Sequence, residues 1–294
     1  MTLRAIDLFA GIGGFHQASH NLNVDVVFAS EWEPNARKTY QENFQTVSPE
    51  LFTSEHFVGD ITKVVPSEIP DFDILMGGFP CQPFSHSGKR QGFQDEKGRG
   101  NLFFNIVAIL EEKRPKAFFL ENVRGLLNHD GGNTFQTIQK LIHDLGYSFH
   151  WQLVKASDFN VPQHRPRVFM VGFRSDVQEN FQFPESVELT NTISQVLGGE
   201  VTTYTGKPRE IGFTLRVGGR RSGIHDRRNW DGYIVNGQEH FLTVDEGKKM
   251  QGFPESFTFP VSDVQAFKQL GNSVAVPAIQ ATLESIVQQL DETA

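Results

Sequence analysis

Apolar runs alternate with amphipathic segments through residues 1–173, which predicts alternating strands and helices. Short apolar runs that end at turn residues predict buried strands at 3–9, 24–29, 73–76, 117–120, 148–154 and 167–173. Apolar residues at helical spacing predict helices from Phe15, from Pro34 to residue 43, over 102–113 and over 133–144, the last capped by Asn133. Strands that alternate with helices indicate a mostly parallel sheet with helices on both faces.

The alternation is lost after Phe173 and returns only near the end of the chain. Residues 174–258 are rich in Gly, Thr, Arg and Asn and contain short irregular runs, which indicates a second, smaller unit. Helical spacing resumes at Val264 and continues to Ile286. We therefore predict a doubly wound α/β domain at 1–175, a small inserted domain at 176–260, and a C-terminal segment, 261–294, that returns to the first domain.

Composition narrows the class of protein. Of the 294 residues, 38% are hydrophobic and 21% are charged, so the chain can bury a sizeable core. It has no apolar leader after Met1 and no apolar stretch long enough to span a membrane. It also has a single cysteine. These features predict a cytoplasmic protein with no membrane partner and no multi-cysteine metal site, and we expect no metal ion.

The distribution of charge bears on nucleic-acid binding. A net charge of −8 gives no overall basic field that would attract a polyanion. Basic side chains nevertheless gather between Lys207 and Arg228, where only Glu210 and Asp226 oppose them. Arginine dominates over lysine there, and several glycines let the backbone approach a ligand closely. If the partner is DNA, this segment is its predicted contact; a solvated surface loop is the alternative.

A glycine turn follows the first predicted strand, in Asp7-Leu8-Phe9-Ala10-Gly11-Ile12-Gly13-Gly14. Such a turn lets a ligand lie against the backbone near a helix N-terminus, but its last glycine comes too early for the dinucleotide pattern. Glu31 ends the second strand, where a carboxylate binds ribose hydroxyls, and Asp60 is placed to accept from an adenine amino group. Together these features predict a nucleoside cofactor without a pyrophosphate, a description that S-adenosylmethionine fits.

Cys81, the only cysteine, lies in Gly78-Phe79-Pro80-Cys81-Gln82-Pro83, directly after an apolar run and a Gly/Pro turn. In α/β folds this is where reactive groups are presented. Most free cysteines are small buried apolar residues, however. The thiol alone therefore leaves both a nucleophile and a core residue open.

Three further charged residues stand next to predicted strands. Glu121 directly follows a buried strand, which points its carboxylate into the crevice at the strand ends; a helix cap or an ion pair is the alternative. Arg165 and Arg167 occupy alternate positions at the start of a strand and therefore project to one side. Such a pair suits an anionic or aromatic ligand, and two surface arginines are the alternative.

The ordered motifs resemble those of the DNA cytosine-5 methyltransferases of bacterial restriction–modification systems, close in layout to the HhaI type. The landmarks are Asp7 to Gly14, Glu31-Trp32, Gly59-Asp60, Pro80-Cys81-Gln82, Glu121-Asn122-Val123, Gln163-x-Arg165-x-Arg167, Gln251-Gly252-Phe253-Pro254 and Gly271-Asn272-Ser273-Val274. They cover nearly the whole chain. One segment departs from the family: where Arg-x-Leu-Thr-Pro-Arg-Glu is usual, this chain reads His240-Phe241-Leu242-Thr243-Val244-Asp245-Glu246. The departure concerns the packing of the small domain more than the chemistry.

The resemblance implies a Rossmann-like S-adenosylmethionine-dependent methyltransferase domain with a small inserted target-recognition domain. It implies methyl transfer to carbon 5 of a cytosine that is flipped out of duplex DNA. Cys81 would add to carbon 6, protonated Glu121 would hold ring nitrogen 3, and Arg165 would position the base. The catalytic group implied in full is Cys81, Gln82, Glu121, Arg165 and Arg167. No residue is assigned to removal of the carbon 5 proton.

The resemblance also implies two sets of binding residues. Those for the cofactor are Phe9, Ala10, Gly11, Gly13, Gly14, Glu31, Trp32, Asp60, Ile61, Gly78, Pro80, Leu102, Asn272 and Ser273. Those for DNA are Ser85, Ser87, Lys89, Arg90 and Arg99 in a loop that would close over the site, and Thr214, Arg216, Arg220, Arg221, Arg227 and Arg228 in the recognition domain. Arginine pairs with guanine more often than with other bases, which favours a GC-containing target.

Three other functions fit parts of this pattern. An RNA methyltransferase of the same fold would carry a Cys-Phe-Thr element, and this chain has no second cysteine. A catalytically inactive DNA-binding module would have lost the cysteine, the glutamate or the glycine turn, all of which are present. A thiol hydrolase would pair Cys81 with a histidine such as His86 or His164, but it would not need the cofactor motifs. We expect a monomer whose partners are double-stranded DNA and a cognate restriction endonuclease that acts on the same site.

Overall fold

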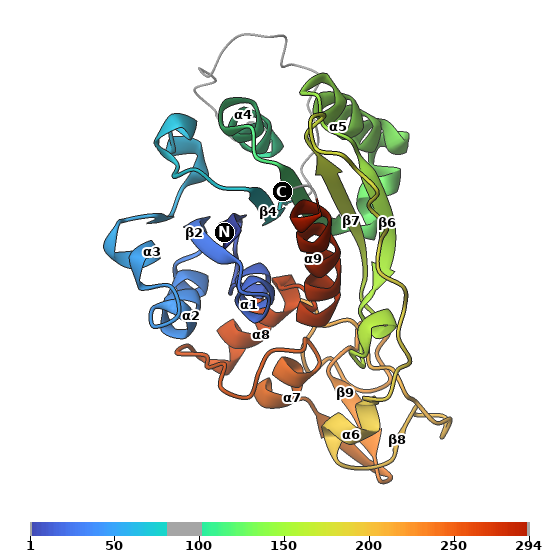
Figure 1. Ribbon diagram of the computed structural model, residues 1–294. Helices are drawn as coiled ribbons and strands as arrows, with labels where there is room; N and C mark the ends of the chain where they lie inside the picture. The colour runs from blue at the N-terminus through green and yellow to red at the C-terminus, as the bar shows by residue number, and fades with distance from the viewer. Residues whose placement is uncertain (1, 81–101, 293–294) are drawn as a thin grey trace.

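A seven-stranded sheet forms the centre of this computed structural model, which describes residues 2–80 and 102–292 (Figure 1). Its strands are β1 (Arg4–Leu8), β2 (Asp25–Ser30), β3 (Phe57–Val58), β4 (Ile74–Gly78), β5 (Ala117–Val123), β6 (His150–Lys155) and β7 (Pro166–Phe173). Their order across the sheet is β3-β2-β1-β4-β5-β7-β6. Neighbours from β3 to β5 run parallel, whereas β7 lies antiparallel to β5 and β6. The predicted doubly wound, mostly parallel sheet is therefore confirmed.

Helices cover both faces of this sheet, as predicted. The helices α1 (Gly14–Asn21), α2 (Pro34–Phe44) and α9 (Val276–Asp291) share one core with the sheet, and α4 (Phe103–Lys113) and α5 (Asn133–Asp144) share the other. Successive strand residues alternate between the two cores, as Ala5 and Ile6 do in β1. Short helical turns complete this part of the chain: α3 (Pro49–Thr53), η1 (Ile61–Lys63), η2 (Pro66–Glu68), η3 (Arg124–Gly132) and η4 (Ala156–Phe159).

Local chemistry sets where the helices begin. Pro34 occupies the first turn of α2, and the Glu33 carboxylate accepts a hydrogen bond from the Ala36 N–H at 2.8 Å. The prediction that Asn133 caps α5 is wrong, because the helix includes Asn133 and its N-cap is Gly132. Gly132 has φ 93°, a left-handed conformation that a glycine adopts without a steric penalty.

A second, three-stranded antiparallel sheet lies in the region that the sequence marks as irregular. It consists of β8 (Val201–Thr202), β9 (Gly232–Val235) and β10 (Gln238–Phe241), with α6 (Ile193–Leu197) and α7 (Val244–Lys249) beside it. Buried residues in and next to this sheet, such as Tyr233 in β9 and Trp230 before it, belong to the same hydrophobic core as the α1 and α9 face of the large sheet. The chain then forms α8 (Asp263–Asn272), and α9 returns to pack along α1. The domain boundaries at 175 and 260 stay a prediction.

The strand order opens a crevice beside β1. The chain moves from β1 outward to β2 and β3, then crosses back to place β4 on the other side of β1. Loops on the two sides of such a switch point diverge, so the carboxyl ends of β1 and β4 border a space for a ligand. No helix in the described part of the chain is long and apolar enough to cross a membrane.

Candidate functional site

A cavity of about 870 Å³ lies at the carboxyl ends of β1, β2, β4 and β5. Its wall from the sheet includes Phe9, Glu31, Gly78 and Glu121, each at or directly after the last residues of a different strand. The second half of α8 contributes Lys268, Gln269, Gly271 and Asn272 from the other side. The volume falls in the range of small-molecule sites. The predicted crevice therefore exists, and the predicted cofactor motifs meet in it.

The glycine turn after β1 is shaped by close packing. Gly11 has φ +56°, and its N–H donates to Glu31 Oε2 at 2.7 Å. A Cβ on Gly13 would lie 2.2 Å from the Phe44 ring, and one on Gly14 would lie 2.5 Å from Val274. Gly11 therefore lines the cavity, whereas Gly13 and Gly14 let α1 approach its neighbours and do not line it.

Glu31 is held by backbone donors at the edge of the cavity. Its Oε1 accepts from the Glu33 N–H at 2.7 Å, in addition to the Gly11 contact at Oε2. Burial raises the pKa of Glu31, and these two backbone N–H groups oppose that rise. A carboxylate has about four lone-pair sites, so acceptor capacity remains for two further donors. A ribose diol presents two such donors, which fits the predicted nucleoside.

Apolar and polar groups beside Glu31 complete the part of the cavity that suits a flat ring. Trp32 lines it with 72% of its surface exposed, and Phe9, Ile61 and Leu102 line it as well. Asp60 Oδ1 accepts from the Thr62 N–H at 3.0 Å and from the Thr62 hydroxyl at 2.7 Å, which caps η1. The Asp60 carboxylate is thus oriented by its own loop before any ligand binds.

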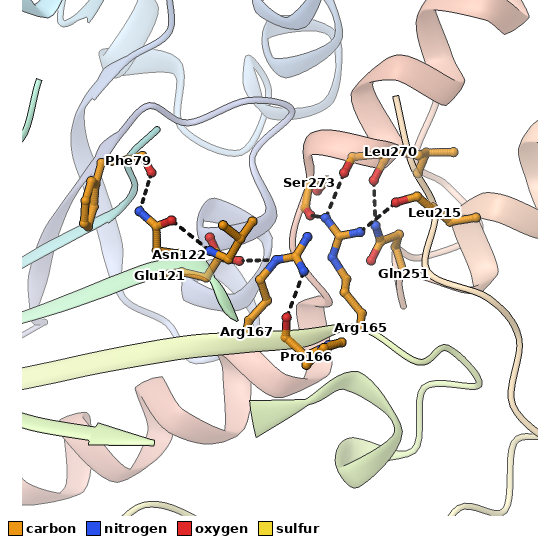
Figure 2. A network of polar contacts seen from close by, with 12 residues as sticks. Phe79, Glu121, Asn122, Arg165, Pro166, Arg167, Leu215, Gln251, Leu270 and Ser273 are labelled. Atoms are coloured by element: carbon orange, nitrogen blue, oxygen red, sulfur yellow. Dashed lines mark hydrogen bonds and ion pairs between the residues drawn. The ribbon is translucent and has the colours of Figure 1, made fainter. Parts of the chain in front are cut away.

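Glu121 and Arg167 form an ion pair on the opposite side of the cavity. Arg167 Nε lies 2.7 Å from Glu121 Oε1, and both residues line the cavity (Figure 2). Gly78 pairs with Glu121 across β4 and β5, and a Cβ on Gly78 would lie only 3.3 Å from Glu121 Oε2. Burial raises the pKa of Glu121, while Arg167 and Arg165 oppose the rise. Burial therefore shifts the titration of this carboxyl group toward higher pH while the group stays in contact with a cation.

Asn122 fixes the backbone that leads to the predicted nucleophile. Its Nδ2 donates to the Phe79 carbonyl at 2.8 Å, and its Oδ1 accepts from the Val123 N–H at 2.8 Å (Figure 2). Phe79 and Pro80 line the cavity directly before Cys81. Of the residues predicted from the sequence, Cys81, Gln82, Ser85, Ser87, Lys89, Arg90 and Arg99 lie outside the described residues.

Arg165 occupies a different environment from Arg167. It is 1% exposed and does not line the cavity, although the two arginines stand two positions apart. Its guanidinium donates to the carbonyls of Leu215 at 3.2 Å, Gly271 at 2.9 Å and Ser273. These contacts differ from the expectation that Arg165 positions a base, because its donors are directed at backbone carbonyls. The geometry supports Arg167 for that role.

The predicted DNA-reading residues lie on the small sheet's side of the molecule. Arg216, Arg221, Arg227 and Arg228 are exposed, and Thr214 is half-buried. Arg220 stacks over Phe267 of α8 at 4.0 Å. Arg228 forms an ion pair with Asp226 at 2.6 Å. The segment therefore contains arginines that contact other side chains, such as Arg220 and Arg228, as well as exposed arginines such as Arg216 and Arg227.

Several cavity residues carry no sequence signal of their own. Ala10, Gly13, Gly14 and Ser273, which were predicted, do not line the cavity, and the unpredicted lining residues are Ile12, Ser30, Glu33, Ala36, Gly59, Thr62, Phe79, Asn122, Val123, Lys268, Gln269 and Gly271. Asn122 lies within a motif that the sequence analysis singles out, so its position could have been included. On α8, Gly271 and Asn272 belong to a motif named from the sequence, whereas Lys268 and Gln269 lie outside any motif and reach the cavity through tertiary packing. Within residues 2–80 and 102–292, no cluster of His, Cys, Asp or Glu is placed to hold a metal ion.

Asp7 is a buried acid beneath the glycine turn. It is 0% exposed, and its carboxylate oxygens make no hydrogen bond of ordinary geometry among the described residues, although the His16 backbone N–H is close enough to oppose the rise in its pKa. Burial and the nearby Glu31 raise the pKa of Asp7 well above its ordinary value. The neighbouring His16 is also buried, which lowers its pKa to about 3, so it supplies no cation to Asp7.

Comparison with known proteins agrees with this geometry. The chain matches the family described as C-5 cytosine-specific DNA methylase over residues 3–211 and 190–288. It is 41% identical to the Type II methyltransferase M.DsaV of Dactylococcopsis salina over 99% of this chain and 88% of that protein. It is 36% identical to the Type II methyltransferase M.HhaI of Haemophilus parahaemolyticus over 98% of this chain and 95% of that protein. A solved structure of a Spodoptera frugiperda DNMT2 mutant shares the fold, with a TM-score of 0.74 at 19% identity over 97% of this chain and 100% of that one.

The Glu31 geometry predicts the effect of an amide at that position. Glu31→Gln should weaken binding of S-adenosylmethionine by roughly 10- to 100-fold, because hydrogen bonds to a charged acceptor are lost. Isothermal titration calorimetry measures this, with Asp25→Asn, an exposed acid at the other end of β2, as the matched control. Equal affinity in Glu31→Gln and the wild type would remove Glu31 from the cofactor site.

The isolation of Asp7 predicts a pH dependence of stability. Its pKa is raised in the folded state, so the stability that it contributes is fully present below its unfolded pKa of about 3.9 and is lost as pH rises through the folded value. Asp7→Asn, which cannot ionise, should abolish that loss and be more stable than the wild type at alkaline pH. Urea unfolding at a series of pH values tests this, and parallel curves for the two proteins would contradict it.

Proposed function

The chain belongs to the family of C-5 cytosine-specific DNA methylases, and we propose that the residues of this cavity carry out the family's reaction on duplex DNA. The protein transfers a methyl group from S-adenosylmethionine to carbon 5 of cytosine. The observation that carries the residue-level proposal is the Glu121–Arg167 pair, which borders the same cavity as the Glu31 turn and the residues directly before Cys81. A base and a cofactor can therefore meet in one enclosed space.

The cofactor half of the cavity fits S-adenosylmethionine, which supplies an electrophilic methyl group when bound. Glu31 accepts from the ribose hydroxyls with the acceptor capacity that its two backbone contacts leave free. Asp60 accepts from the adenine amino group, and Trp32 with Phe9 contacts the ring faces. The Gly11 turn leaves room for the ligand against the backbone.

Cys81 and Glu121 activate the cytosine. The Cys81 thiolate forms a bond to carbon 6. The electron pair of the carbon 5–carbon 6 double bond then forms a carbon 4–carbon 5 double bond, and that of the carbon 4–nitrogen 3 double bond moves to nitrogen 3, which leaves an enamine with a nucleophilic carbon 5. Protonated Glu121 donates to ring nitrogen 3 and stabilises the charge that develops there. The methyl group would come from S-adenosylmethionine, whose sulfur–methyl bond breaks so that S-adenosylhomocysteine leaves. A base then removes the carbon 5 proton, the carbon 5–carbon 6 double bond forms again, and the Cys81 thiolate leaves carbon 6.

Arg167 supports this step from the wall of the cavity next to Glu121. Its guanidinium holds Glu121 in position through the contact at 2.7 Å and has further donors for an oxygen of the base. This partly exposed cation also stabilises negative charge that develops on the ring. We assign to Arg167 the base-positioning role that the sequence analysis gave to Arg165, because Arg167 lines the cavity and Arg165 does not.

DNA is proposed to lie between the large and small sheets, with the target cytosine flipped into the cavity. The exposed arginines between residues 216 and 228 contact the duplex from the small domain. The Type II names of the relatives support a role as the modification arm of a restriction–modification system with a cognate endonuclease. A monomeric, cytoplasmic enzyme is the form that we propose for this activity.

Base-resolution methylation sequencing tests the function directly. Unmethylated duplex DNA of mixed sequence is incubated with the protein and S-adenosylmethionine, and modified cytosines are expected within one short motif. Cys81→Ser should give no modification while it still binds the cofactor, because a hydroxyl is a far weaker nucleophile at neutral pH. Modification by that variant would exclude Cys81 as the nucleophile. No modification by the folded wild type would turn attention to RNA substrates or a regulatory role.

The raised pKa of Glu121 predicts the pH profile of the chemical step. Deprotonation of Cys81 increases the rate as pH rises, and loss of the Glu121 proton decreases it as pH passes the raised pKa of Glu121. Glu121→Gln should slow single-turnover methylation by about 10²- to 10⁴-fold and remove the descending limb. Glu112→Gln, an exposed site on α4, is the matched control. A descending limb that persists in Glu121→Gln would assign it to another group.

A further inference from the structure

One helix contacts both the cavity and the segment proposed to read DNA. Four residues in the second half of α8 line the cavity: Lys268, Gln269, Gly271 and Asn272. On the same helix, Phe267 lies under the Arg220 guanidinium at 4.0 Å and beside the Trp230 ring at 5.9 Å. We call residues 213–228 the recognition segment. A shift of α8 therefore alters the cavity wall and the support of the recognition segment together.

The C-terminal end of α8 is held by side chains from elsewhere in the chain. Carbonyls in the last turn of a helix have no partner within the helix. Here Gln251 Nε2 donates to the Leu270 carbonyl at 2.6 Å, and Arg165 donates to the Gly271 carbonyl at 2.9 Å and to the Ser273 carbonyl (Figure 2). The guanidinium charge also suits this end of the helix, because the helix dipole is negative there.

Residues directly before β7 also hold the first residues of the recognition segment. Arg165 donates to the Leu215 carbonyl at 3.2 Å, and Gln163 Oε1 accepts from the Leu215 N–H at 3.0 Å. Both backbone groups of Leu215 are thus bound by residues that precede β7. A Cβ on Gly271 would lie 2.6 Å from the Arg216 carbonyl carbon, so the two backbones already touch. Arg165 bridges them where they meet.

The side chains that make these contacts are buried, and none of them is a carboxylate. Gln163, Arg165 and Gln251 are 0%, 1% and 0% exposed. In the described part of the chain, no carboxylate oxygen lies within 4.0 Å of the Arg165 guanidinium; its two Nη atoms donate to three backbone carbonyls, while its buried Nε has no partner among the described residues. Because a buried cation is costly unless its donors are satisfied, the carbonyls of Leu215, Gly271 and Ser273 are constrained to remain around it.

We propose that Arg165 is a positioning residue that couples the cofactor cavity to the recognition segment. A cofactor that contacts Gly271 and Asn272 restricts the end of α8, and through Arg165 it restricts Leu215 and the residues that follow. None of residues 213–228, all of which the structure describes, lines the cavity, so the cofactor reaches them only through the surrounding protein. Coupling of this kind is reciprocal: a partner that orders the recognition segment tightens cofactor binding equally. The reciprocal half rests on the proposed DNA function.

Hydrogen exchange of the protein with and without S-adenosylhomocysteine tests the coupling without DNA. In the wild type, saturating S-adenosylhomocysteine should slow exchange by about fivefold or more at residues 271–273 and also at 213–217. In Arg165→Lys, which keeps the charge but loses the planar fork, slowing at 271–273 should remain and slowing at 213–217 should be lost. Arg174→Lys, directly after β7 and paired with Asp176, is the matched control and should behave as the wild type.

The possible outcomes separate this inference from the proposed function. Wild-type protein that shows slowing only at 271–273, or Arg165→Lys that keeps the slowing at 213–217, would overturn the coupling. If Arg165→Lys does not fold, Gln163→Met releases the Leu215 N–H and the Met250 carbonyl and should reduce the slowing at 213–217; an unchanged value would count against the proposal. Failure of the wild type to modify DNA would reject the proposed function and leave the exchange result standing.

Discussion

The parallel pairing of β1, β4 and β5 is the constraint on which the site depends. Parallel strands end at one edge of the sheet, so Phe9, Gly78 and Glu121 arrive side by side although they are far apart in the sequence. The absence of a side chain at Gly78 leaves the space that the Glu121 carboxyl occupies. Because β7 runs antiparallel, its beginning lies at this same edge, and Arg167 reaches Glu121 from there.

Backbone atoms hold two of the polar side chains at this edge. Glu31 is bound by the N–H groups of Gly11 and Glu33, and Asn122 is bound to the Phe79 carbonyl and the Val123 N–H. Such contacts depend on the path of the chain and not on a second side chain, so they orient the functional groups as soon as the loops have formed. The site is in this sense organised before any ligand arrives, which limits the reorganisation needed when one binds.

Strong local signals made much of the fold and the site predictable. The apolar strands and the glycine turn are encoded within a few residues each, and the motifs around Glu31 and Glu121 lie directly after predicted strands. The small sheet was not predicted, since β8 has only two residues and turns interrupt the rest. The separate environments of Arg165 and Arg167 could not be inferred either, because strand alternation places both on one side and only the distant carbonyls of Leu215, Gly271 and Ser273 distinguish them.

The manner in which Leu215 is held bears on how such a protein acquires a new target. Gln163 accepts from its N–H and Arg165 donates to its carbonyl. Every residue has this carbonyl, and every residue except proline has the N–H. The backbone at the start of this segment is therefore held by contacts that do not depend on which side chains follow from Arg216 onward. Arginines could be exchanged for other residues there while the backbone keeps its attachment. A fixed catalytic framework can in this way carry interchangeable reading surfaces, and sequence specificity can diversify separately from chemistry.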